Sequence, residues 1–121
     1  MKQTVYTDNL KMSLLKPLNT AQECELLGGR YFICRLSALA LLEQEEKATQ
    51  AFDAGDMRQA SLLNVQMLLD CLCDPDGQPI PPEALPSADA LMAAHDNGTL
   101  LDAIATVKRH AMGSLEDAQK N

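Results

Sequence analysis

The chain has 121 residues, 46% of them apolar, which is enough for one domain with a single modest core. Seventeen acidic residues against ten basic ones give a formal net charge of -7, which repels nucleic-acid phosphates and anionic lipid headgroups. Only two Phe, two Tyr and no Trp are present, so the aromatic side chains on which bases stack are scarce, and we expect neither nucleic-acid nor membrane binding.

Two further features indicate a cytoplasmic protein. The first residues, MKQTVYTDNLKMSLLK, contain charged interruptions and no continuous apolar run, and nowhere do eighteen apolar residues occur together. This excludes a signal peptide and a membrane-spanning helix. Cys24, Cys34, Cys71 and Cys73 are expected to be reduced in that compartment and to pack as small hydrophobic side chains.

The N-terminal third predicts little regular structure. Residues 1–22 are mixed and polar and are interrupted by Pro17, which predicts a loosely packed N-terminal arm. In the run ECELLGGRYFICRL, Gly28 and Gly29 separate two segments, and the second is rich in aromatic and β-branched residues. This pattern permits a short β-hairpin, which would be marginally stable by itself.

Two helices follow. Ser37 precedes an Ala, Leu, Glu and Gln stretch that ends at Gly55, as expected for an N-cap, a helix and a stop. Asp56 is placed to cap a second helix, MRQASLLNVQMLLDCLC. The apolar face of this second helix comprises Leu62, Val65, Leu69 and Leu72. The proline-rich segment DPDGQPIPPEALP cannot continue the helix and predicts an ordered loop.

The C-terminal part predicts two more helices. Ser87 is expected to cap a short helix that runs through His95 and is closed by Asn97-Gly98. Thr99 is expected to cap LLDAIATVKRHAM, which Gly113 would close. The apolar positions of this last helix include Leu100, Ile104, Val107 and Ala111. The prediction is a mainly α fold of about four helices, with one helical domain at 23–113 and a flexible tail at 114–121.

Three chemical hypotheses find weak support in the residue spacing. Cys71-x-Cys73 with the two histidines suggests zinc, but the cysteine pair ends an apolar helix instead of lying on a turn. Asp74 to Glu83 partly matches a calcium loop, but its first ligand position falls on Leu72. A catalytic pocket around Asp70, Asp74 and His95 would need a nucleophile turn or phosphate loop that the chain lacks. We therefore expect no metal, no cofactor and no enzymatic activity.

The order of the elements resembles that of the tail assembly chaperones of long-tailed, siphovirus-type bacteriophages. The resemblance covers roughly residues 26–113 and rests on element order and on one acidic turn. Its landmarks are Gly28-Gly29, Leu36-Ser37-Ala38, Leu68-Leu69-Asp70, Asp74-x-x-Gly77-x-Pro79 and Leu101-Asp102-Ala103-Ile104. The aromatic residue usual after the turn is replaced here by Ile80-Pro81.

This resemblance implies a protein of the host cell cytoplasm that binds the tape measure protein, keeps it soluble during tail tube assembly and is absent from the virion. It also implies self-association, and as further partners the major tail protein and a longer, frameshifted form of the chain. The end Gln119-Lys120-Asn121 permits the slippery heptamer A-AAA-AAC.

The expected partner-binding surface consists of the apolar faces of the second and last helices. These residues are Leu62, Val65, Leu69, Leu72, Leu100, Ile104 and Val107. The alternative is another small acidic helical adaptor, such as a secretion-type chaperone that binds an apolar helical segment of a different cargo. The same apolar faces are equally compatible with a purely intramolecular core.

Overall fold

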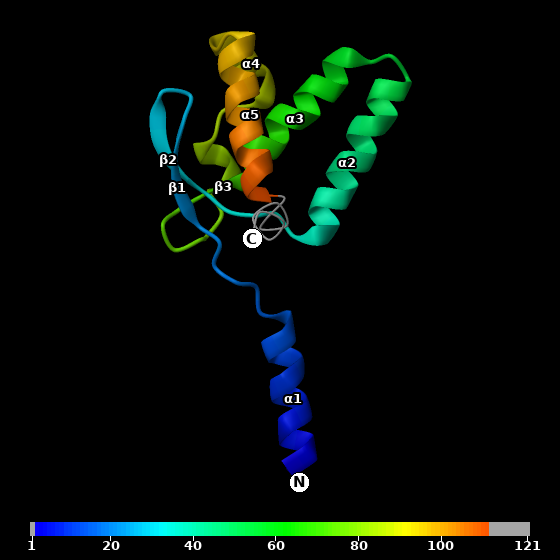
Figure 1. Ribbon diagram of the computed structural model, residues 1–121, viewed down its shortest axis with the longest axis vertical. Helices are drawn as coiled ribbons and strands as arrows, with labels where there is room; N and C mark the ends of the chain where they lie inside the picture. Colours follow the sequence, from blue (N-terminus) through cyan, green and yellow to red (C-terminus); the bar gives the residue numbers. More distant parts are fainter. Residues whose placement is uncertain (1, 112–121) are drawn as a thin grey trace, which may run out of the picture.

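The computed structural model describes the backbone of residues 2–111 and the side chains of residues 9–111. This part contains five α-helices and a small antiparallel sheet, so the predicted mainly α fold is confirmed (Figure 1). Gly113 and the predicted tail 114–121 lie outside the described residues. None of the described helices has the length and apolar character needed to cross a membrane.

The predicted hairpin is present. Strands β1 (Gln22–Leu26) and β2 (Gly29–Ile33) pair antiparallel, with Leu26 opposite Gly29. The two turn residues, Leu27 and Gly28, have φ of 52° and 81°, which is the backbone twist that a two-residue type I′ hairpin needs. Glycine adopts this conformation at no steric cost, whereas Leu27 is held there by the pairing of the strands and by its contact with the core.

Helices α2 (Ala38–Asp53) and α3 (Met57–Cys71) form a helical hairpin at one side of the molecule (Figure 1). Both predicted N-caps are confirmed, since Ser37 Oγ accepts from the backbone N–H of Ala40 and Asp56 Oδ1 accepts from that of Gln59, each at 3.1 Å. These bonds satisfy N–H groups that have no partner within the first turn of a helix.

The prediction that α3 continues through Cys73 was wrong. The helix ends at Cys71, and the next two residues form strand β3 (Leu72–Cys73), which pairs with β2 in the sheet order β1-β2-β3. The carbonyl of Cys71 accepts from the backbone N–H of Cys34 at 2.8 Å. Pairing with a strand distant in sequence therefore overrides the helical pattern of these residues.

After the 3-10 turn η1 (Pro82–Ala84), the chain forms α4 (Ala88–Ala94) and α5 (Asn97–Ala111). Ser87 caps α4 as predicted. The predicted helix stop at Asn97-Gly98 and the predicted N-cap at Thr99 were wrong, because Asp96 starts α5. The carbonyl of Asp96 accepts from the backbone N–H of Leu100, and its carboxylate accepts from the N–H and the hydroxyl of Thr99. Asn97-Gly98 thus lies in the first turn of α5.

The structure of the segment before the hairpin also differs from the prediction. Lys2–Leu15 form helix α1, where no strong element was expected. Figure 1 shows α1 extending away from the other helices. Leucine, methionine and lysine favour a helix locally. The helix ends two residues before Pro17, in agreement with the restricted backbone of a residue that precedes proline.

The core lies between the hairpin and helices α3, α4 and α5. Its largest fully buried side chains are Ile33, Met67, Leu68, Val65, Val107 and Cys71. Helix α2 contributes no buried residue and packs mainly against α3. The described part of the chain buries no charged or polar side chain, so apolar contacts hold this core together.

Candidate functional site

The residues predicted to bind a partner lie mostly in the core. Five of them are at most 9% exposed, namely Val65, Leu69, Leu100, Ile104 and Val107. Leu62 and Leu72 are half-buried and pack against the same core. In this conformation the apolar faces of α3 and α5 contact each other, so the intramolecular alternative accounts for most of this pattern. Partner binding through these residues stays a prediction.

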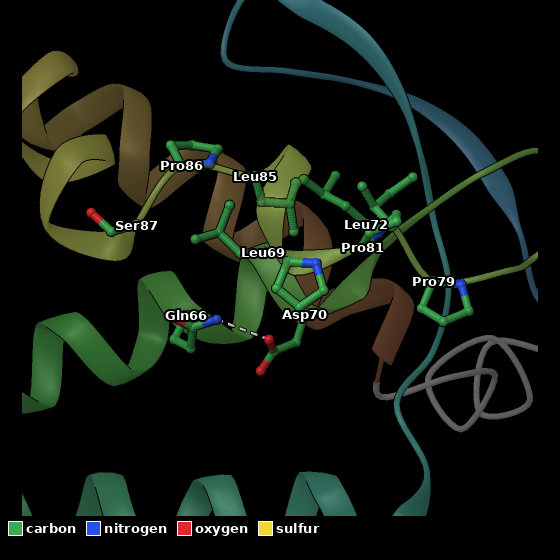
Figure 2. A pocket seen from close by; sticks show the side chains of 11 residues that line it. Gln66, Leu69, Asp70, Leu72, Pro79, Pro81, Leu85, Pro86 and Ser87 are labelled. Carbon is green, nitrogen blue, oxygen red and sulfur yellow. Dashed lines mark hydrogen bonds between the residues drawn. The ribbon is translucent and has the colours of Figure 1, made fainter.

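Two of the predicted residues also line a hollow on the described surface, which we name the proline groove. It has a volume of about 580 Å³ and lies between the C-terminal half of α3 and the loop that leads to α4 (Figure 2). The residues that line it are Gln66, Leu69, Asp70, Leu72, Pro79, Ile80, Pro81, Pro82, Leu85, Pro86 and Ser87.

One wall of the proline groove is helical and the other is a loop stiffened by proline. Leu69 projects from the end of α3 and Leu72 from the start of β3, while the opposite side is formed by the run from Pro79 to Ser87 (Figure 2). Proline has a fixed φ and no backbone N–H, so this wall has little conformational freedom and few donors. The groove is therefore suited to apolar contacts.

The polar lining of the groove is limited to Gln66, Asp70 and Ser87. Gln66 Nε2 donates to Asp70 Oδ1 at 2.9 Å, so part of the hydrogen-bonding capacity of this edge is used within α3 (Figure 2). No histidine or cysteine lines the groove, and Ser87 Oγ caps α4. This set of side chains can bind an apolar segment.

An acidic turn fixes the start of the loop wall. Asp74 Oδ1 accepts from the backbone N–H groups of Asp76 and Gln78, both at 2.9 Å, and the backbone N–H of Gly77 donates to the carbonyl of Asp74. The carboxylate that the calcium hypothesis required thus holds a turn. Across the described residues, no three His, Cys, Asp or Glu side chains are close enough to hold a metal ion.

The two cysteines of the zinc hypothesis are buried. Burial raises the pKa of Cys71 and of Cys73 to about 12, so both thiols are protonated at neutral pH. Cys73 Sγ lies 2.7 Å from Cys34 Sγ. These thiols pack beside the end of the sheet, consistent with their interpretation as small hydrophobic side chains.

A cluster of hydrogen bonds, which the sequence did not indicate, connects the segment before β1 to the end of α5. His110 Nε2 lies 2.8 Å from the carbonyl oxygen of Thr20 and therefore donates to it, and Thr20 Oγ1 accepts from the backbone N–H of Arg35. Arg35 Nε donates to the carbonyl of His110 at 2.8 Å. The two contacts made by His110 join residues 75 and 90 positions apart. Local sequence patterns carry no signal for such pairings.

In the described part of the chain, exposed apolar side chains outside the groove include those of two surfaces. The first is residues 2–18, which are called the N-terminal arm from here on and on which Leu10, Met12, Leu14, Leu15 and Leu18 are exposed. The second is the side of α2 turned away from α3, which we name the α2 outer face. Helical spacing places Leu39, Leu42, Glu43, Glu46 and Asp53 on it. Leu39 is 64% and Leu42 is 52% exposed.

Comparisons with known proteins agree with the resemblance in element order. The family described as "Phage tail assembly chaperone protein, TAC" matches residues 9–121, which include the hairpin, the proline groove and all the helices after α1. No curated protein and no solved structure matches the chain. Because the match covers nearly the whole sequence, this acidic helical protein belongs to the phage tail assembly chaperone family.

Proposed function

We propose that this protein binds an apolar segment of the tape measure protein in the proline groove, keeps the tape measure protein soluble while the tail tube assembles, and is then released. The observation that carries the proposal is the groove itself, with apolar walls, a volume of about 580 Å³ and only three polar lining residues. A tape measure protein is long and helical, so before the tube surrounds it, its apolar seams would aggregate in water.

The shape and charge of the chain support this function. The groove can accept the apolar side chains of a partner helix, and the proline-rich wall loses little conformational entropy when a ligand binds. The net charge of -7 keeps a complex of many copies with an apolar cargo soluble. Many weak contacts along one tape measure molecule would give strong binding overall and still allow release.

The test is co-expression of the full chain with the tape measure protein from the same genome. The fraction of tape measure protein that stays soluble and copurifies is measured. Ile80→Asp places a charge in the groove at a half-buried loop residue. We expect this variant to lower copurification at least tenfold, because an unpaired carboxylate in an apolar contact is costly.

The matched control is Leu101→Asp, which places the same charge on an exposed residue of α5 outside the groove. It should retain the tape measure protein at the unmodified level. Circular dichroism establishes that both variants are folded. Equal copurification by the two variants would exclude the proline groove as the binding site, and an insoluble tape measure protein with the unmodified chain would contradict the proposed function.

A further inference from the structure

Besides the proposed cargo site, the structure points to a second interaction surface. We propose that the N-terminal arm of one molecule docks on the α2 outer face of a second copy of this chain.

The first observation that supports this docking is the exposure of apolar side chains on the arm. Leu10, Met12, Leu14 and Leu15 are 42% to 83% exposed and point to different sides of α1. A helix that is apolar on several sides is normally covered by other elements.

The length of α1 leads to the same conclusion. It has 14 residues, and an isolated helix shorter than about 12–15 residues is marginal in water without tertiary contacts. Figure 1 shows α1 directed away from the remaining helices, including its own α2. A helix of this composition therefore gains its stability from a surface that another molecule supplies.

Charge complementarity identifies that surface. Over residues 2–18 the arm has three lysines, Lys2, Lys11 and Lys16, and one acidic residue, Asp8, which gives a net charge of +2. The α2 outer face presents Glu43, Glu46 and Asp53 around two exposed leucines. Apolar side chains on both partners, flanked by opposite charges, give attraction together with a fixed register.

The proline groove fits the arm less well. Its single acidic lining residue, Asp70, already accepts from Gln66. The α2 outer face is also free of contact with α3, which packs on the other side of α2 (Figure 1). Reciprocal docking of the arms of two molecules gives a closed dimer, and docking of each arm on the next molecule gives a ring or an open chain of copies.

The experiment measures self-association of the full chain by size-exclusion chromatography with light scattering over a range of concentrations. Variant A carries Lys11→Glu and Lys16→Glu, and variant B carries Glu43→Lys and Glu46→Lys. Each variant alone has like charges on its arm and its α2 outer face, so we expect the Kd for self-association to rise at least tenfold in both.

Mixing variants A and B restores opposite charges between molecules but not within either one. We expect the equimolar mixture to associate with a Kd within about threefold of the unmodified chain, a factor worth only ~0.65 kcal/mol at RT of 0.59 kcal/mol. The control carries Arg58→Glu and Arg109→Glu, which lowers the net charge by the same amount as variant A, at exposed residues outside the arm and α2. It should associate like the unmodified chain.

An unmodified chain that is monomeric at every concentration overturns the proposal, as does a mixture of A and B that stays as dissociated as its components. Loss of association in the Arg58 and Arg109 control also overturns it, since net charge would then be the cause. This inference does not depend on the proposed function. Ile80→Asp should leave self-association unchanged, and variant A tests association without any tape measure protein.

Discussion

Cys71 shows how a single buried side chain links folding to pH. It ends α3, is 1% exposed, and burial raises the pKa of its thiol from 9.0 to about 12. Between these pH values the unfolded chain releases the thiol proton and the folded chain retains it. The thiol therefore favours the folded state fully below pH 9, and this contribution is lost as the pH rises toward 12.

We expect the free energy of unfolding to fall as the pH is raised above 9, by up to about 1.4 kcal/mol per pH unit for each such thiol. Urea unfolding at a series of pH values measures this slope. Cys71→Ala removes the titrating group while keeping an apolar side chain, so its slope should be shallower. An identical slope in the variant would show that Cys71 titrates alike in both states.

At the scale of elements, Asp96 determines where α5 begins. Its carboxylate accepts from the backbone N–H of Thr99 at 3.0 Å and from the hydroxyl of Thr99 at 2.6 Å, and these hydrogen bonds hold the pKa of Asp96 below its ordinary value. A depressed pKa stabilises the folded state at neutral pH, and this stabilisation is lost as the pH falls through the pKa in the folded chain.

Asp96→Ala is expected to lower Tm at pH 7 more than Thr99→Ala, because the first change removes both hydrogen bonds and the second removes only the bond from the hydroxyl. Thermal unfolding followed by circular dichroism compares the two variants. The difference between them should shrink in acid, where Asp96 is protonated. A larger effect of Thr99→Ala would instead support Thr99 as the cap.

Elements defined by neighbouring residues were predictable, and those defined by distant contacts were not. Ser37, Asp56 and Ser87 each accept from an N–H three residues later, so a local pattern was sufficient to place α2, α3 and α4. Strand β3 depends on pairing with β2, some 40 positions earlier in the chain, which no local pattern indicates. Near α5, only Thr99 was predicted as the cap, whereas the structure places Asp96 in that role three residues earlier.

The candidate site was predicted only in part for a related reason. The proline-rich segment was recognised as an ordered loop, but periodicity does not tell whether an apolar helix face packs within the chain or against a partner. Leu69 and Leu72 line the proline groove and also contact the core, whereas Ile80 and Leu85 were not among the predicted binding residues. The loop conformation brings these four side chains together.

For the whole molecule, the position of the core separates residues needed for folding from those free to bind. Ile104→Asp places a carboxylate where α3 and α5 pack, so we expect a loss of several kcal/mol of stability and no cooperative unfolding transition. Leu101→Asp, on the exposed side of the same helix, should change stability by less than about 0.5 kcal/mol. Urea unfolding of both variants checks this contrast.

A cooperative, near-native transition for Ile104→Asp would mean that α5 packs less tightly than its burial indicates. The burial of these core residues also determines how a binding assay of their variants is interpreted. A variant of Leu69 or Ile104 that fails to bind a tape measure protein would report unfolding and not the loss of a contact surface.

The hairpin has an outer strand whose open edge leaves backbone groups available for pairing with a strand of another molecule. Strand β1 is at the edge of the described sheet, and Glu23 and Glu25 alternate along it as exposed residues. If two such edges approached to form a continuous sheet, their carboxylates would be brought close together and would repel. This strand thus carries its own protection against fibril-like stacking.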